Sequence, residues 1–537
     1  MKGINTKTFA NKKSNSCTKK LNIPSNDIDY KLVFIIFVGI LVRVLEFGNM
    51  PYGFNQDEAF AGYEAFSLLK YGVDSHGYPN PCYFVSWGSG MNVLESYLAI
   101  PFMALFGCSV ITLRLPQLIL ACISIPVFYL LLKRVFGRTT ALWGTAILAV
   151  CPWHIMLSRW GLESNLAPSL LLIGLYFLLL GTDNSKFFVL SAVFYGIALY
   201  SYAITWVIVP LTIFLCGYYL LIIDRKIQIK YVLIACFVLL LFAAPLILFL
   251  LVNKNIIPEI VTPFLSVPKM LEMRAAEISL KNLISPNAYY NFFNIFINQT
   301  DNLIWNSTDQ FGMFYKISLP FIFIGIAVLV TKAIKSIKDK CFSYDMFVLL
   351  AAISSFLGCV AISNLNINKS NSFHFYTLIF LCVGINQTVK LFSNPNLVKK
   401  AIVCAYTVMF VFFCSFYFGN YQNTIASDFR YGVGEAIEYA KEQQFELVYV
   451  DSSVYHSQVL FFDQTPNDVY RSTVKYNNYP SAYLNAKEFS NYVFTSNYSV
   501  LDKTGAYIIR SDMANTFESN GYNVKYFDNY AVAVYNG

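Results

Sequence analysis

The sequence predicts an all-α polytopic membrane protein that ends in a small α/β domain. Of its 537 residues, 56% are hydrophobic and only 13% are charged, whereas about a quarter of the residues in a soluble protein are charged. The mean hydropathy is +0.51. Long apolar runs recur up to about residue 418, and short alternating runs replace them after it.

Eleven runs are long and apolar enough to predict membrane-spanning helices, since about 20 residues are needed to cross the hydrocarbon layer. They lie at about 31–48, 114–132, 139–157, 165–181, 187–201, 203–223, 231–252, 314–331, 346–363, 373–392 and 400–418. A twelfth apolar segment, 92–107, is shorter and contains Glu95 and Pro101. Whether this segment crosses the membrane decides the side of every later loop.

The positive charges indicate that 92–107 lies along the membrane surface. With this assignment, the short basic loops all fall on the cytoplasmic side, as Lys and Arg prefer. These loops lie near 133–138, 186, 224–230, 332–340 and 390–400. If 92–107 crossed instead, the same loops would all lie outside. We therefore expect an interfacial amphipathic helix here and a cytoplasmic N-terminus.

This topology predicts the domain organisation. A basic tail, 1–30, lies in the cytoplasm, a transmembrane domain covers 31–418, and its two long outer loops cover 49–113 and 253–313. The extracytoplasmic domain, 419–537, begins with a helix-like stretch at 427–444. Short β-rich runs follow it: ELVYVD, QVLFFD, AYIIRS, NVKYF and YAVAVY. Alternation of this kind is typical of strands.

Charge and cysteine usage exclude several classes of function. The net charge of +8 comes mostly from Lys and Arg at the ends of apolar runs, so it reports topology and not nucleic-acid binding. The twelve Cys are scattered, mostly within apolar runs, and form neither a disulfide framework nor a CxxC metal signature. We predict no metal site and no cofactor from the residues.

The acidic pair Asp57 and Glu58 is the first candidate for chemistry, because it lies in the first outer loop just after the first span. The pair opens a stretch that suits a helix lying on the membrane and stopping at Gly72. Acidic residues in a first helical turn also simply offset the helix dipole. The turn-rich segment after it, with Asp74 and His76, favours a functional loop, since long structured loops often carry function.

Two further polar clusters lie at the outer ends of predicted spans. CPWHIMLSRWGLESN holds Arg159 and Glu163, together with His154, which we interpret as a packed residue. Arg159 is a candidate anion ligand, although an Arg near a helix end can also snorkel to the interface. SNLNINKSNSFHFY holds Lys369 and His374. Positive charge on the outer side opposes the general bias and suggests an anionic ligand such as a lipid phosphate.

Several segments, in order, resemble the GT-C membrane glycosyltransferases, specifically the protein O-mannosyltransferase and aminoarabinose transferase-like group. The matching features are Pro51, Gly53, Asp57 and Glu58 in P-x-G-x-x-x-DE, then YGVDSHGYPNP, KRVFGRTTALWGTAILAVCPWHIMLSRW and FGMFYKISLPFIFIGI. The resemblance implies a GT-C catalytic domain at 31–418 and interfacial helices in the first outer loop. It also implies a polyprenyl-phosphate sugar donor, with Asp57 as the base, and leaves dependence on a divalent metal open.

The residues suit this chemistry. A polyprenyl phosphate is a good leaving group, so the reaction needs chiefly one base and cations near the phosphate. We therefore expect inversion, with Asp57 as base and Glu58 as its partner, and with a protein, lipid or cell-envelope glycan as acceptor. Asp74, His76, Arg159, Glu163, Lys369 and His374 are the candidate substrate-binding residues. A transporter or flippase of lipid-linked sugars is the main alternative, although such proteins place ionisable groups near the midplane. A membrane sensor is a weaker one.

Overall fold

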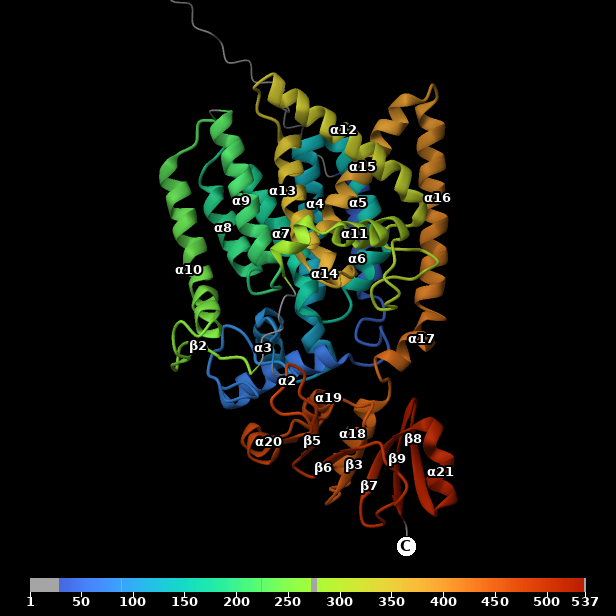
Figure 1. The fold of residues 1–537 in the computed structure, drawn as a ribbon. Helices are drawn as coiled ribbons and strands as arrows, with labels where there is room; N and C mark the ends of the chain where they lie inside the picture. Colours follow the sequence, from blue (N-terminus) through green and yellow to red (C-terminus); the bar gives the residue numbers. More distant parts are fainter. Residues whose placement is uncertain (1–28, 88, 224, 272–277, 536–537) are drawn as a thin grey trace, which may run out of the picture.

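A helical bundle stands above a smaller sheet domain in the computed structural model (Figure 1). The structure describes residues 29–535 except 88, 224 and 272–277. The predicted cytoplasmic tail, 1–30, therefore falls almost wholly outside the described residues. The sheet domain lies at the same end of the bundle as the helices of the first outer loop (Figure 1).

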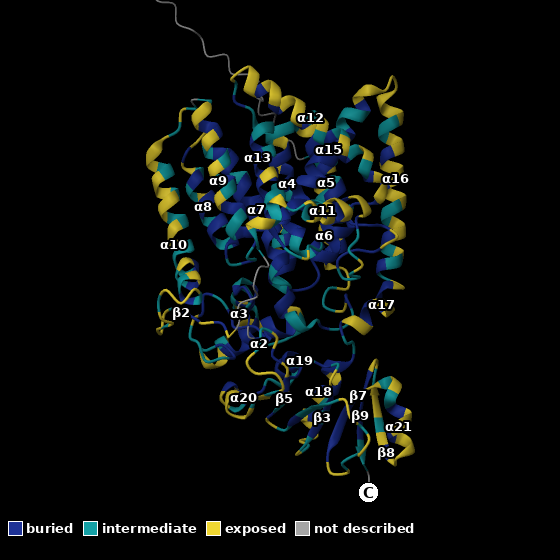
Figure 2. Cartoon of the chain, viewed as in Figure 1, coloured by how far each residue is buried: buried dark blue, intermediate teal, exposed yellow. Residues whose placement is uncertain are grey.

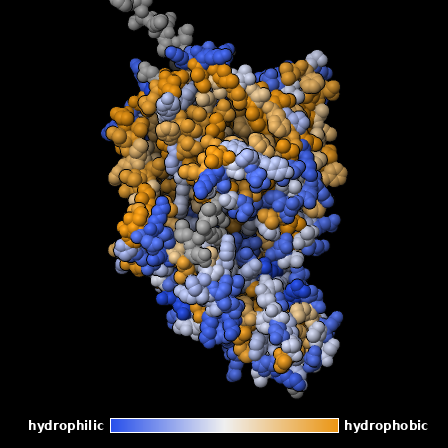
Figure 3. All heavy atoms as spheres, viewed as in Figure 1, coloured by the Kyte–Doolittle hydropathy of each residue, from blue (hydrophilic) through white to orange (hydrophobic). Residues whose placement is uncertain are grey.

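Eight helices of the described chain are long and apolar enough to cross a membrane. They are α4 (Val110–Phe136), α7 (Glu163–Gly181), α9 (Thr205–Ile222), α10 (Ile229–Asn253), α12 (Leu319–Lys338), α13 (Tyr344–Ala361), α15 (His374–Leu391) and α16 (Pro395–Tyr417). Their outward faces are apolar: α10 and α16 are largely exposed (Figure 2), and hydrophobic side chains cover the bundle (Figure 3). Exposed apolar surface on this scale is the mark of a multi-pass membrane protein.

The three remaining predicted spans are shorter helices. The first is α1 (Tyr30–Val44) and another is α8 (Phe187–Ala198), with 15 and 12 residues. The run 139–157 is not one helix, as we expected, but α5 (Arg138–Val150) followed by α6 (Pro152–Leu157). Cys151 separates them with ψ 121°, because the residue before a proline is pushed out of the helical region.

The loop 49–113, predicted to be the first outer loop, contains two helices that lie side by side at the lower end of the bundle (Figure 1). Both ends of α2 (Gln56–Tyr71) follow from local chemistry: a capping box at Asn55 starts it, and Gly72 ends it with φ 73°. The second helix, α3 (Leu94–Phe106), is the segment predicted to lie on the membrane surface, and Leu105 and Phe106 at its end are exposed.

The apolar residues of α2 do not face lipid, as a helix lying on the membrane would require. Phe60, Tyr63 and Phe66 are buried, because α3 and the C-terminal domain cover the helix from two sides. The helix therefore connects the bundle to the C-terminal domain.

The second outer loop and the linkers contain short elements. They are β1 (Ile260–Val261), β2 (Ser266–Val267), η1 (Leu280–Ile284), α11 (Pro286–Asn298), η2 (Lys316–Ser318), α14 (Ile367–Ser370), η3 (Asn371–Phe373) and α17 (Tyr421–Asp428). β1 and β2 pair antiparallel. The amide of Cys82 donates to the Ser266 carbonyl at 2.9 Å, so the second outer loop contacts the first.

The C-terminal domain is a seven-stranded sheet with the order β4-β5-β6-β3-β7-β9-β8. Its strands are β3 (Val448–Asp451), β4 (Lys475–Tyr476), β5 (Ala486–Phe489), β6 (Tyr492–Thr495), β7 (Ala506–Arg510), β8 (Tyr522–Phe527) and β9 (Tyr530–Tyr535). Its helices are α18 (Val433–Glu442), α19 (His456–Asp463), α20 (Asn467–Thr473), η4 (Ser511–Met513) and α21 (Ala514–Ser519). β3 is central and runs parallel to both β6 and β7.

The structure corrects one predicted strand. QVLFFD, which we expected to be β-rich, lies in α19. The side chain of Gln458 accepts a hydrogen bond from the Tyr455 amide at 3.1 Å and so starts the helix. Val459, Leu460 and Phe461 are all buried, because α19 lies between the sheet domain and α2 and has apolar neighbours on more than one side. A short run that is apolar on all sides does not distinguish a buried helix from a strand.

Candidate functional site

The Glu58 carboxylate is completely enclosed by hydrogen-bond donors. Arg114 at the start of α4 donates from Nε and Nη2 at 2.8 and 2.9 Å. The amide of Asn55 donates at 3.2 Å and that of Gly161 at 2.7 Å. Glu58 and Arg114 are both fully buried. A buried carboxylate is stable as an ion only with partners of this kind, so Glu58 anchors α2 to the bundle.

A second buried carboxylate, Glu95 of α3, lies beside this ion pair. Gly161 contacts both acids: a Cβ there would lie 3.0 Å from Glu95 and 3.7 Å from Glu58. Among the described residues, neither oxygen of Glu95 has a hydrogen-bond partner. Burial, and then the charge of Glu58, raise the pKa of Glu95 to about 8. Glu58, Glu95, Arg114 and Gly161 together form what we call the carboxylate hub.

Asp57 differs from its neighbour, because it is partly exposed while Glu58 is buried. Its backbone amide donates to the side chain of Asn55 at 2.9 Å. The position is the first turn of α2, where the helix dipole favours a negative charge. The hub thus fixes the backbone that carries Asp57, while the Asp57 carboxylate lies nearer the surface.

Arg159 and Glu163 connect elements around the hub. The guanidinium of Arg159 is buried and donates to the carbonyl groups of Val42, Arg43 and Leu45 at 3.1, 3.0 and 2.5 Å. It therefore caps the C-terminal end of α1, where free carbonyl groups favour a cation. Glu163 accepts from the Asn92 amide at 2.5 Å and so holds the start of α3 against α7.

His374 contacts a set of hydrogen-bonded polar residues from several helices, which we call the polar belt. Gln117 donates to the carbonyl of Asn165 at 3.0 Å, and Asn371 donates to the Asn165 side chain at 2.9 Å. Trp153 donates to Asn371 at 2.8 Å, and its ring lies 5.1 Å from that of His374. These residues come from α4, α6, α7, η3 and α15. The belt lies close to the hub, because the Asn165 side chain also donates to the carbonyl of Trp160, the residue before Gly161, at 3.3 Å.

Several atoms of this polar belt lack partners. Within the described part of the chain, Gln117 Oε1, Ser372 Oγ and His374 Nδ1 are buried and make no hydrogen bond. Buried polar atoms nearly always have a partner, which is water or a ligand where the protein supplies none. Lys369, two residues before Asn371, donates from Nζ to the Ser363 carbonyl at 3.4 Å. The belt can therefore accept a polar group.

Asp74 and His76 do not join the hub. They follow the opposite end of α2, which is about 24 Å long at 1.5 Å per residue. Asp74 accepts from the amides of His76 and Tyr78 at 2.9 and 2.8 Å and so shapes the turn. Burial raises the pKa of Asp74 to about 7 and lowers that of His76 to about 4. Both residues lie near the C-terminal domain, since His76 and His456 line one small cavity.

The C-terminal domain holds the helix that carries the acidic pair. Gln458 and Ser457 of α19 donate to the carbonyl groups of Phe54 and Gln56 at 2.6 and 3.0 Å. The amide of Phe54 in turn donates to the Phe429 carbonyl at 2.6 Å. Phe54 and Gln56, which lie shortly before Asp57, are therefore positioned by the C-terminal domain.

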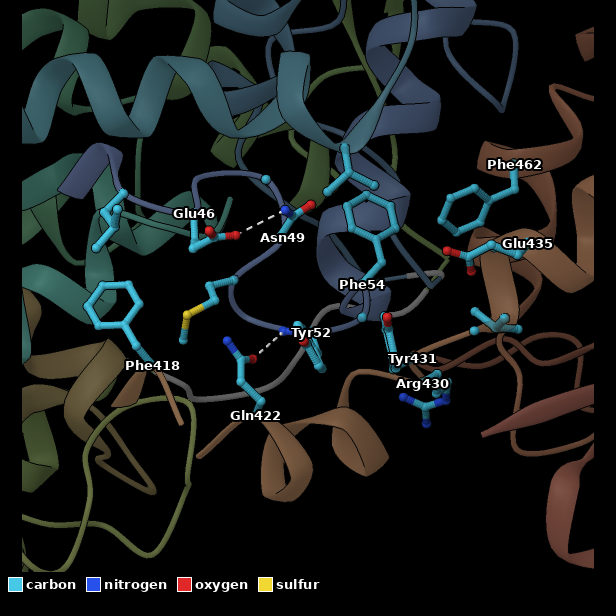
Figure 4. Close-up of a pocket in the computed structure, with 18 residues that line it drawn as sticks. Glu46, Asn49, Tyr52, Phe54, Phe418, Gln422, Arg430, Tyr431, Glu435 and Phe462 are labelled. Carbon is cyan, nitrogen blue, oxygen red and sulfur yellow. Dashed lines mark hydrogen bonds between the residues drawn. The ribbon is translucent and has the colours of Figure 1, made fainter. Parts of the chain in front are cut away.

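A groove of about 710 Å³ opens between the end of α1, this loop and the C-terminal domain. Figure 4 shows Tyr52 and Phe54 on one side and Arg430, Tyr431 and Glu435 on the other. Tyr52 and Tyr431 stack with ring centroids 4.5 Å apart. The groove is lined by Phe54, three residues before Asp57, and its lining is polar as well as aromatic.

Sequence reasoning missed Arg114, Gly161 and the role of Glu95. Arg114 opens a long apolar run, and an ionisable residue in that position is a signal for a buried partner. The partner, Glu58, lies 56 positions away, and no local pattern connects the two. Among the described residues, no group of three or more His, Cys, Asp or Glu side chains is placed to hold a metal ion.

Comparison with known proteins agrees with the resemblance seen in the sequence. Residues 93–249 match the family model of dolichyl-phosphate-mannose-protein mannosyltransferase. The crystal structure of ArnT from Cupriavidus metallidurans in the apo state aligns over 94% of this chain and 97% of that chain, with 12% identity and a TM-score of 0.52. The same protein bound to undecaprenyl phosphate gives 11% identity, the same coverage and a TM-score of 0.52.

An Archaeoglobus fulgidus oligosaccharyltransferase in the apo form aligns over 81% of this chain and 63% of that chain, with 13% identity and a TM-score of 0.49. No curated protein sequence matches the chain. The chain thus has the fold of ArnT, and residues 93–249 match the mannosyltransferase family model, in line with the GT-C resemblance of the sequence.

Proposed function

We propose that this protein is an inverting glycosyltransferase that moves a sugar from a polyprenyl phosphate to an acceptor on the outer face of the membrane. The observation that carries the proposal is the contrast within the acidic pair. Glu58 is buried among four donors, whereas Asp57 is partly exposed at the rim of the same structure. Glu58 thus holds α2 in place, and Asp57 lies on the same fixed helical turn, where it can act as a base.

The reaction is a single displacement. Asp57 accepts the proton of the acceptor group while that group attacks the anomeric carbon of the sugar. The bond from that carbon to the phosphate oxygen breaks, and the polyprenyl phosphate leaves with the electron pair. A second carboxylate to protonate the leaving group is not needed, as it is in glycosidases, because a phosphate is already a stable anion.

The polar belt is our candidate for the donor head group. Its unpartnered atoms include His374 Nδ1 and Ser372 Oγ among the described residues, and Lys369 is close in sequence. ArnT, which shares the fold, has been crystallised with undecaprenyl phosphate, and this supports a polyprenyl phosphate as the donor class. Arg159 is a weaker candidate than the sequence suggests, because two of its nitrogens already bind the end of α1.

A donor assay tests the proposal. The full chain in lipid nanodiscs is incubated with radiolabelled polyprenyl-phosphate sugars and with a membrane extract as the source of acceptor. We expect one donor to lose its sugar and release polyprenyl phosphate in a time-dependent way. If the chain moves lipid-linked sugars across sealed vesicles but leaves every donor chemically intact, it is a transporter and the proposal is wrong.

A further inference from the structure

The C-terminal sheet has a topological switch point beside its central strand. From β3 the chain continues into α19, which packs with α18 on one face of the sheet. From the neighbouring strand β6 the chain continues through Tyr498 and Leu501, which pack on the opposite face with Phe517 of α21. Where two adjacent parallel strands send their connections to opposite faces, a crevice forms at their carboxyl ends.

A cavity of about 600 Å³ occupies this crevice. Ser452 and Ser453, directly after β3, line one side, and Thr495 and Ser496, at the end of β6, line the other. The volume lies within the usual range for small-molecule sites, which is about 300–1,000 Å³. The location and the size together mark a binding site that is separate from the acidic pair and the polar belt.

The chemistry of the lining suits a ligand with many hydroxyl groups. Besides the hydroxyl side chains, Asn477 and Asn485 line the cavity. Within the described part of the chain, the side-chain amide groups of these two residues make no hydrogen bond. Tyr455 and Phe494 add ring surface. Amides and hydroxyls both donate and accept, as the hydroxyl groups of a sugar do, and rings cover its apolar face.

An anionic ligand is a poorer fit. Arg430 is the one cationic Lys or Arg side chain among the described residues that line the cavity. Its guanidinium already donates to the carbonyl groups of Ser453 and Asp428 at 2.5 and 3.0 Å and lies 4.4 Å from the Tyr455 ring. Phosphate sites use several cations or backbone amides. We propose that the crevice binds a neutral saccharide.

Arg430 also connects the crevice to the groove of Figure 4, because it lines both. A saccharide chain that leaves the crevice along Arg430 would enter this groove, which is also lined by Phe54, three residues before Asp57. The C-terminal domain would then select a glycan acceptor. That role rests on the proposed function, whereas binding of a saccharide in the crevice does not.

Binding is tested on the full chain in lipid nanodiscs, because glycoside detergents themselves carry sugars. The probes are neutral oligosaccharides of three to six residues built from mannose, glucose, galactose or arabinose, and saturation-transfer NMR reports contact. We expect at least one to bind, and the double variant Asn477→Ala with Asn485→Ala to weaken its Kd about tenfold, as two lost hydrogen bonds would. Asn515→Ala in α21, which is also exposed, is the matched control.

Three outcomes would overturn the proposal. No oligosaccharide binds, or the double variant binds as well as the control variant, or inorganic phosphate or a nucleotide displaces the bound saccharide. The donor assay stays independent of all three. A chain that cleaves its donor but binds no saccharide is a transferase without this site, and a chain that binds saccharide but cleaves no donor refutes the transferase alone.

Discussion

At the scale of single residues, environment separates two adjacent carboxylates. The sequence singles out Asp57 and Glu58 but treats them almost alike, because neither local pattern nor spacing distinguishes them. Arg114 and the Gly161 amide distinguish the two residues, because they enclose only Glu58. The first of these partners comes from another helix, so the assignment of roles becomes visible only in three dimensions.

Removing the charge of Glu58 should therefore destabilise the protein more than removing the charge of Asp57. Glu58→Gln removes the charge that balances a buried guanidinium, and breaking such a pair costs about 3–5 kcal/mol. Asp57→Asn, at a partly exposed position, should change stability by no more than about 1 kcal/mol. Thermal unfolding of both variants in nanodiscs compares them. Equal melting temperatures for the two variants would contradict the anchoring role of Glu58.

Glu95 gives the protein a predictable pH dependence. Its folded-state pKa is about 8, above the usual value of 4.5, so the unfolded chain loses this proton at lower pH than the folded chain does. Stability from this group is present below about pH 4.5 and falls as the pH rises to about 8. Glu95→Gln should thus melt at a higher temperature than the wild type at pH 8, with a smaller difference at pH 5.

The control for this pH effect is Glu446→Gln, which removes an exposed carboxylate of the C-terminal domain. Its melting temperature should follow that of the wild type at both pH values. If Glu95→Gln also parallels the wild type from pH 5 to pH 8, then the carboxyl group of Glu95 is not held neutral by burial.

At the scale of elements, the contact between α2 and α19 sets the position of the acidic pair. Both ends of α2 are predictable, since a cap at Asn55 and a glycine at Gly72 are local signals. α19 is not, because its apolar residues face α2 as well as the sheet and erase the helical period. The burial of α19 between α2 and the sheet thus explains both why 458–463 was predicted as a strand and why α19 holds α2.

Gly62 of α2 packs directly against Phe461 of α19. A Cβ there would lie 2.5 Å from the Phe461 ring, so Gly62→Ala should push α19 away. We expect a lower melting temperature and faster proteolytic release of the C-terminal domain. Gly217→Ala in α9 is the control, because a Cβ there meets nothing within 4 Å, and alanine in an open helical position stabilises by about 0.5–1 kcal/mol. Equal proteolysis of both variants would refute the docking contact.

At the scale of the whole molecule, the sequence predicts the architecture well where the signal is hydropathy. Each of the eleven predicted spans contains helix, and the fold is the one that the resemblance implies. Hydropathy did not predict the break between α5 and α6 at Cys151, nor the order of the seven strands in the C-terminal sheet. The sheet pairs strands that are far apart in sequence, and the short strands β5 and β6 leave only a weak periodic signal.

Orientation in the membrane follows from α3. If this helix does not cross, then positions on α2 and α3 lie on the outer side, opposite the end of α12. Lys70→Cys and Leu105→Cys, both at exposed positions, should react with a membrane-impermeant maleimide in intact cells, and Lys338→Cys should not. The background needs its twelve native Cys replaced. If Lys70→Cys and Lys338→Cys react but Leu105→Cys does not, then α3 crosses the membrane and the assigned side of every later loop is reversed.

The central claim is that Asp57 is the base of a sugar transfer. The direct measurement is the rate at which wild type and Asp57→Asn release polyprenyl phosphate from the radiolabelled donor, with melting temperature as the check on folding. Loss of a general base should slow the reaction by about 10²- to 10⁴-fold without lowering the melting temperature. A folded Asp57→Asn variant that turns over donor at the wild-type rate would contradict the account.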